Sequence, residues 1–137
     1  MSERRYDAWF KEAQADFKAG NALYDQKLFN LAVFHFLQAS EKAMKALLYL
    51  NNTRPWGHSI TALLDEYEDL GQHVIINIKD AALDIEPHYT ASRYPGDATD
   101  VAPSDIYDDI LAGDVREKAQ TILDFVEQER KAWKPKL

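Results

Sequence analysis

The sequence predicts an all-α protein, an antiparallel up-and-down bundle of four to five helices forming one domain over residues 1–137. Apolar residues recur at spacings of three and four through most of the chain, as in helices that bury one face. No stretch shows the strict alternation of a half-buried strand. The connections between the expected helices are short, which favours antiparallel neighbours. With 46% hydrophobic residues, the chain can form one self-sufficient core.

The helices are expected at about residues 3–24, 29–50, 59–70, 73–92 and 105–133. The second is the most apolar, so its first half should be buried centrally. Ser59 is a suitable N-cap for the third helix, and Gly71 a suitable residue to end it. Pro87 lies inside the fourth, where it should kink the helix or restart it for one turn.

The last helix should begin at a cap formed by Ser104 or Asp105, and Gly113 could split it. Its expected core stripe consists of Ile106, Ile110, Leu111, Val115, Ala119, Ile122, Leu123 and Val126.

A repeat architecture is the competing interpretation of the first two helices. Gly20, Leu23, Ala32, Phe36 and Ala39 have the spacing of small and aromatic positions in a tetratricopeptide unit. One such unit cannot bury its own apolar face, and no second copy follows about 34 residues later. Packing of one helix pair is therefore the simpler interpretation.

Composition excludes several kinds of site. The chain has no cysteine, which rules out disulfides, iron–sulfur clusters and a thiol nucleophile. Its four histidines form neither an i, i+4 pair nor an HExxH motif, and no phosphate-binding glycine loop occurs, so we expect no cofactor and no metal site. The charged N-terminus lacks the apolar run of a signal peptide, and no window of about 18 apolar residues predicts a membrane span. We expect a cytoplasmic protein.

The net charge of −7 is unevenly distributed. Residues 1–54 carry 8 Lys/Arg and 6 Asp/Glu, residues 55–115 carry 2 and 13, and residues 116–137 carry 6 and 4, for net charges of +2, −11 and +2. An acidic middle segment is not the footprint of a nucleic-acid-binding protein, which needs Lys and Arg to neutralise phosphates. A local basic patch or a basic protein partner remains open.

Several motifs together resemble one family. They are Trp9-Phe10 followed by Ala13 and Asp16, the segment AVFHFLQASEKAMKALL at residues 32–48, His58 before a short helix, and YTASRYPGD at residues 89–97. Spread over nearly the whole chain, they resemble the HEPN domain family of prokaryotes. The resemblance implies a dimerising bundle of four or five helices. It also implies nucleotide binding and a separate small nucleotidyltransferase partner, the two acting as a toxin–antitoxin-like pair.

One branch of that family consists of metal-independent ribonucleases, which use an Arg and a His separated by four to six residues. This chain departs from that pattern. Arg54 and His58 have only three residues between them, and His88 precedes Arg93 instead of following it. No catalytic role is therefore transferred, and His88, Arg93, Arg54 and His58 stay candidates only.

The segment PHYTASRYPGD, residues 87–97, is the first candidate ligand site. Arg93 could grip a phosphate with its planar fork, Tyr89 or Tyr94 could stack on a base, and His88 could donate a hydrogen bond or act as acid or base. In the structural alternative, the segment is a helix end and turn. Arg93 then binds a carboxylate, with Asp84, Glu86 and Asp97 as the available partners.

Lys42 and Lys45 add to this site if they face the same cleft as Arg93. In isolation, Lys45 forms an i, i+4 pair with Glu41 worth only a few tenths of a kcal/mol. Three functions stay open on this basis: a nucleotide-binding partner module, an RNA-cleaving enzyme using Arg93 with His88 or Arg54 with His58, and a structural interaction bundle.

Overall fold

The computed structural model describes residues 1–97 and 100–136. Within these residues all regular structure is helical, which confirms the predicted all-α bundle. The long helices are α1 (Ser2–Asp25), α2 (Phe29–Leu50) and α7 (Asp109–Ala132). The shorter ones are α3 (Ile60–Asp69), α4 (Ile76–Ile85), α5 (His88–Ala91) and α6 (Pro103–Ile106). No helix in the described ranges is both long enough and apolar enough to cross a membrane.

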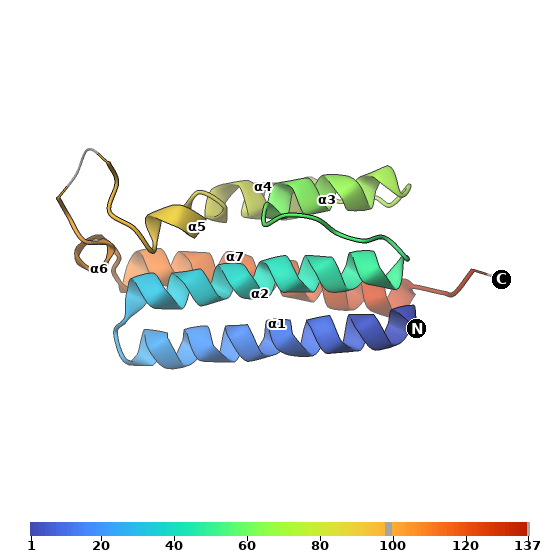
Figure 1. Cartoon of the computed structure of the whole chain (residues 1–137), viewed down its shortest axis with the longest axis horizontal. Helices are drawn as coiled ribbons and strands as arrows, with labels where there is room; N and C mark the ends of the chain where they lie inside the picture. The colour runs from blue at the N-terminus through green and yellow to red at the C-terminus, as the bar shows by residue number, and fades with distance from the viewer. Residues whose placement is uncertain (98–99, 137) are drawn as a thin grey trace.

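Helices α1 and α2 form an antiparallel hairpin and lie side by side along their whole length (Figure 1). They pack tightly at Gly20, where an added Cβ atom would lie 2.5 Å from Cε1 of Phe36. Phe36 is fully buried, so its ring cannot move aside freely. A glycine at this position is thus explained by the packing of one helix pair, without a repeat.

Helix α2 is the centre of the core, as its composition predicts. It packs against α1, α7 and α3. The largest fully buried side chains of the helix are Val33, Phe36, Leu37, Met44, Leu47, Leu48 and Leu50. Burying each such side chain stabilises the fold by roughly 1.5–3 kcal/mol, so this helix holds the bundle together.

The loop between α2 and α3 runs back along α2 (Figure 1), so that His58 reaches Glu41, well before the end of that helix. Ser59 then caps α3 as predicted, because its hydroxyl accepts a hydrogen bond from the Ala62 amide at 3.1 Å. Glu86 fixes this junction by accepting from the Ser59 hydroxyl at 2.6 Å and the Thr61 hydroxyl at 2.8 Å. Burial raises the pKa of Glu86, but these hydrogen bonds outweigh it and leave the pKa below its ordinary value.

The predicted helix at 73–92 is two helices. Helix α4 begins only at Ile76, because Ile75 is extended and Val74 is inserted into the core. The chain restarts after Pro87 as the single turn α5, which is the second of the two outcomes expected at this proline.

The predicted helix at 105–133 is also divided, but not at Gly113. Helix α6 ends at Ile106, Tyr107 is extended, and α7 begins at a cap provided by Asp108, whose carboxylate accepts from the Leu111 amide at 2.8 Å. Because the helix is interrupted there, Ile106 and Ile110 are 54% and 78% exposed instead of buried. From Val115 to Val126 the predicted stripe is buried.

Candidate functional site

A continuous row of rings and charges crosses the outer surface of α2. It is called here the aromatic–cationic strip, and its members in contact order are Arg5, Tyr49, Trp9, Lys45, Glu41, His58, Tyr89, Phe34 and Arg93. Four of its members lie on α2 at the spacing of one helix face, while α1, the loop 51–59 and the α5 region supply the rest. The opposite face of α2 is the core.

Arg93 ends the strip and is held by rings. Its guanidinium lies 4.4 Å from the centre of the Tyr89 ring, 4.8 Å from that of Phe34 and 5.0 Å from that of Tyr94. Its Nε donates to the Tyr89 carbonyl oxygen at 2.9 Å. These contacts fix the plane of the fork and leave its remaining N–H groups without a carboxylate partner in residues 1–97 and 100–136.

The carboxylates proposed as alternative partners of Arg93 are engaged elsewhere. Asp84 pairs with Lys118 at 3.1 Å, and Glu86 binds the start of α3. Asp97 is exposed and forms no ion pair with Arg93. A guanidinium oriented by three rings, with free donors, has the geometry for binding a phosphate or carboxylate from solution.

His58 is the second accessible group of the strip, with a side chain 66% exposed. Its ring stacks on Tyr89, the ring centres being 5.8 Å apart and the planes 18° from parallel. Its Nδ1 lies 3.2 Å from a carboxylate oxygen of Glu41, which is buried. Because a carboxylate only accepts hydrogen bonds, Nδ1 carries the proton and, in the neutral ring, Nε2 is the acceptor.

The two lysines assigned to the site are both neutralised. Lys45 lies in the strip and pairs with Glu41 at 3.1 Å. Lys42 is one row away and pairs with Asp16 at 2.6 Å, where His35 also binds the carboxylate. Neither therefore contributes a free positive charge of the kind carried by Arg93.

His88 takes part in a different set of contacts. Its Nδ1 lies 2.8 Å from the hydroxyl of Tyr107, and the two rings meet edge to face at the start of α7. Burial lowers the pKa of His88, with Asp114 opposing that shift and Lys118 adding to it. No contact among the described residues joins His88 to Arg93, whose partners face α2.

Arg54 and His58 are also apart. Side chains along the loop alternate between exposed and partly buried, as in an extended segment. The exposed ones are Asn52, Arg54, Trp56 and His58. Arg54 lines a hollow at the Arg5 end of the strip, together with Arg5, Trp9 and Tyr49. The structure thus brings Lys45, His58, Tyr89, Arg93 and Tyr94 into one connected surface, and it leaves Lys42 and His88 outside it. Arg54 is not in the row of contacts and borders the surface only at the hollow.

Some residues of this surface are not identified by sequence reasoning. Trp9 has the spacing of the buried face of α1, yet it is partly exposed and stacks on Tyr49. Trp56 is 87% exposed, which is unusual for tryptophan and typical of residues that contact a partner or ligand. The i, i+4 pairs of cation and ring, Arg5 with Trp9 and Lys45 with Tyr49, are the sequence signal that could have identified this end of the surface.

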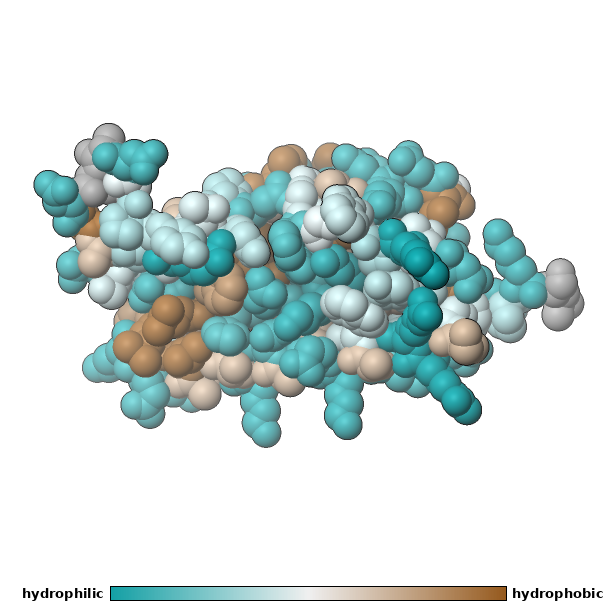
Figure 2. Space-filling model, viewed as in Figure 1, coloured by the Kyte–Doolittle hydropathy of each residue, from teal (hydrophilic) through white to brown (hydrophobic). Residues whose placement is uncertain are grey.

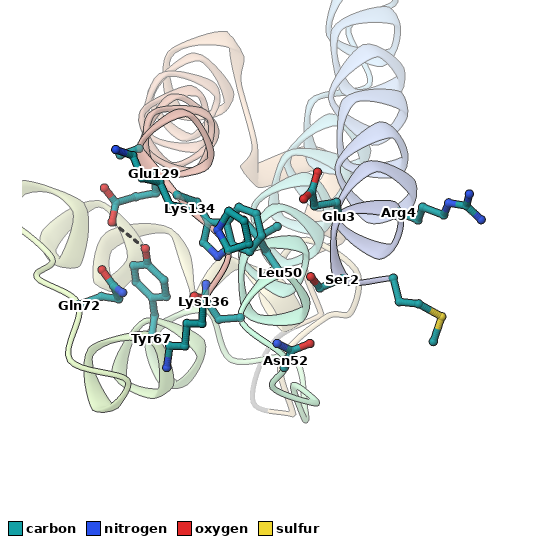
Figure 3. Close-up of a pocket in the computed structure, with 15 residues that line it drawn as sticks. Ser2, Glu3, Arg4, Leu50, Asn52, Tyr67, Gln72, Glu129, Lys134 and Lys136 are labelled. Carbon is teal, nitrogen blue, oxygen red and sulfur yellow. Dashed lines mark hydrogen bonds between the residues drawn. The ribbon is translucent and has the colours of Figure 1, made fainter.

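Two other surface features are less organised. In the view of Figure 2 the molecule is mostly hydrophilic, with a hydrophobic patch over the turn between α1 and α2, where Leu28 and Leu31 are exposed. A hollow of about 760 Å³ lies where the ends of α1, α2, α3 and α7 meet. Inside it the Tyr67 hydroxyl binds Glu129 at 2.7 Å, while Arg4 points away from it (Figure 3). No group of three His, Asp or Glu suited to a metal occurs in the described part of the chain.

The fold and the strip define a small helical bundle that presents one ring-lined, partly cationic face. The model of the HEPN domain family matches residues 6–130, and the chain belongs to that family.

Solved structures of similar proteins have the same fold. The crystal structure of TT1696 from Thermus thermophilus has a TM-score of 0.85 and 29% identity, and the match covers 90% of this chain and 97% of that one. ST0689, an archaeal HEPN homologue, has a TM-score of 0.76 and 29% identity over 90% and 96% of the two chains. An HEPN domain protein from Thermotoga maritima, TM0613, shares the fold with a TM-score of 0.73 and 24% identity, covering 90% and 98%. A search of curated proteins finds no match.

Proposed function

We propose that this protein is a nucleotide-binding HEPN module of the cytoplasm, which acts as a homodimer with a separate small nucleotidyltransferase in a toxin–antitoxin-like pair. The environment of Arg93 is the observation that supports nucleotide binding. A guanidinium oriented by Tyr89, Phe34 and Tyr94, with no carboxylate paired to it in the described residues, suits a phosphate. Tyr94, 57% exposed, and the His58 ring offer surfaces on which a base can stack.

Isothermal titration calorimetry with ATP, GTP and their diphosphates tests this part. We expect saturable binding without turnover. Arg93→Ala should weaken it about tenfold to a hundredfold, because a hydrogen bond to a charged group contributes roughly 1.5–3 kcal/mol. Arg116→Ala is the matched control, since Arg116 also lies over a tyrosine, at 4.0 Å from the Tyr24 ring centre, and its partners Tyr24 and Asn21 are not members of the strip. Absence of binding at millimolar nucleotide, or equal loss in both variants, would contradict the proposal.

The partner and the dimer are supported by family membership. Co-expression with a nucleotidyltransferase encoded beside this gene should yield a complex that survives gel filtration. Light scattering on the purified protein at micromolar concentration should return about twice the chain mass. A mass near 15.7 kDa would contradict the homodimer, and failure to co-purify with such a neighbour would contradict the pairing.

A second candidate function, metal-independent RNA cleavage, is favoured by one feature. His58 is an exposed imidazole oriented by the buried carboxylate of Glu41, an arrangement suited to a general base. Cleavage of RNA in EDTA that is lost in His58→Gln but retained in His88→Gln would support this function over simple binding. An unchanged rate in His58→Gln would exclude His58 as its base.

A further inference from the structure

A cationic hollow lies at the end of the strip opposite to Arg93. Its lining residues are Arg5, Ala8, Trp9, Tyr49 and Arg54, and it encloses about 430 Å³. A smaller hollow of about 140 Å³ shares Arg5, Tyr49 and Arg54, so the two form one depression between the start of α1 and the end of α2. Those two helix ends are neighbours because the hairpin is antiparallel (Figure 1).

The charges of this depression are not balanced by the described residues. Arg5 and Arg54 are both exposed, and neither forms an ion pair with a carboxylate in residues 1–97 and 100–136. By contrast, nearby Lys45 is paired with Glu41 and Arg130 with Glu3. Two guanidiniums that line the same hollow in a chain of net charge −7 form a local positive site, which an anion would stabilise.

Rings give the depression a fixed floor. Trp9 and Tyr49 stack with ring centres 5.4 Å apart, and the guanidinium of Arg5 lies 5.6 Å from the centre of the Tyr49 ring. Contact with a ring face orients the guanidinium plane but uses none of its N–H donors, so these stay available. The partly buried rings also provide an apolar surface beside the charges.

We infer that this hollow is a second anion site, which takes the phosphoryl group of a small phosphomonoester between Arg5 and Arg54. Two guanidinium charges match a phosphomonoester, which carries about −1.5 to −2 near neutral pH, better than they match a single carboxylate. The body of the ligand rests against Trp9 and Tyr49. The site is separate from that at Arg93, because the Lys45–Glu41–His58 part of the strip lies between them.

Two-dimensional NMR on the full chain tests the inference, since the indole N–H of Trp9 reports the hollow and the amides of Arg93 and Tyr94 report the other site. AMP, ribose 5-phosphate and inorganic phosphate serve as probes at constant ionic strength. We expect a saturable Trp9 shift with all three. AMP should bind most tightly of the three, because its body offers the largest surface to the Trp9 and Tyr49 rings, and inorganic phosphate most weakly.

Arg5→Gln and Arg54→Gln should each weaken the Trp9 response about tenfold or more, whereas Arg93→Ala should leave it unchanged. Arg4→Gln is the matched control, because it removes the same charge from the adjacent position outside the hollow. The inference is overturned if Trp9 shows no saturable shift at millimolar probe, or if Arg4→Gln weakens it as much as Arg5→Gln. Shifts confined to Arg93 and Tyr94 would overturn it while leaving the nucleotide proposal intact.

Discussion

The two faces of α2 are specialised for different tasks. The inner face, including Phe36, Leu37 and Met44, has essentially no exposed surface and meets α1 and α7 through close-packed apolar atoms. The outer face carries Phe34, Glu41, Lys45 and Tyr49, linked to neighbouring elements by ring contacts and ion pairs. Interactions on the inner face depend on the volume of the buried side chains, because the core is closely packed. Interactions on the outer face depend on charge and on the orientation of polar groups.

This difference separates stability from binding within one helix. A change of volume on the inner face should lower the free energy of unfolding. A change of charge on the outer face should mainly alter what the surface binds, with Glu41 as the exception because its carboxylate is buried. Two substitutions test that division, one at each face, and a third tests His88, which lies outside both faces; they follow from the largest expected effect to the smallest.

Gly20→Ala should lower the free energy of unfolding by about 1–3 kcal/mol, despite the better helix propensity of alanine. The new methyl group would lie 2.5 Å from Cε1 of Phe36, a ring enclosed by the core. Urea denaturation followed by circular dichroism measures the change. Gly113→Ala is the control, because the nearest atom to its added Cβ is the Tyr24 hydroxyl at 3.6 Å, so this variant should be as stable as the parent or more so. Equal effects of the two substitutions would refute the packing argument.

Glu41→Gln should cost about 1 kcal/mol, less than Gly20→Ala, because the amide retains a hydrogen-bond acceptor but loses the charge that Lys45 and His58 face. The comparison is with Asp114→Asn, whose exposed carboxylate pairs with Lys118 and should contribute less than about 0.5 kcal/mol. Chemical denaturation at pH 7 distinguishes them. If Asp114→Asn cost as much as Glu41→Gln, burial of Glu41 would not be what makes its charge important.

The smallest expected effect is pH-dependent and concerns His88, at the junction of α5 with α6 and α7. Its folded pKa is below the ordinary 6.5, so its contribution to stability is fully present above the unfolded pKa and is lost as the pH falls through the lower folded pKa. Stability should therefore decrease between pH 7 and pH 5, and His88→Gln should lessen the decrease while keeping an acceptor for Tyr107. Thermal melts at both pH values measure it. The stability of the control His73→Gln, changed at an exposed position, should decrease with pH as much as that of the parent. An equal decrease in His88→Gln would show that His88 is not its cause.

The hairpin of α1 and α2 could be predicted to within a few residues because its apolar spacing and its ends agree with its final structure. The predictions at 73–92 and 105–133 were wrong in their boundaries for a local reason. Val74 is apolar at helical spacing but reaches the core from a segment that is not helical, and Asp108 is a cap although it resembles any acidic residue of a first turn. Ile106 and Ile110 have helical spacing and yet face solvent, which periodicity alone cannot reveal.

The sequence predicts which residues could form the candidate site, but not which of them contact one another in the fold. Tyr89 and Arg93 share a helix face in any helical reading of their spacing. Spacing could not predict that Asp16 neutralises Lys42 or that His88 binds Tyr107, because these contacts join different segments of the chain. Ser59 caps α3 as the sequence predicts, but the binding of the preceding His58 to Glu41, 17 residues earlier, could not be predicted from position alone.

The α1–α2 hairpin has a consequence for how the chain folds. The two helices are joined by a turn of only three residues, 26–28, so little loop-closure entropy is lost when they meet. Helix α7 joins α2 only after the whole segment between them has been brought back. Contacts between segments close in the chain lose less loop-closure entropy than distant ones, and proteins rich in local contacts fold fast. We therefore expect the contact between Gly20 and Phe36 to be among the first native contacts to form, and the outer face of α2 to be completed later, when the loop and α5 close over it.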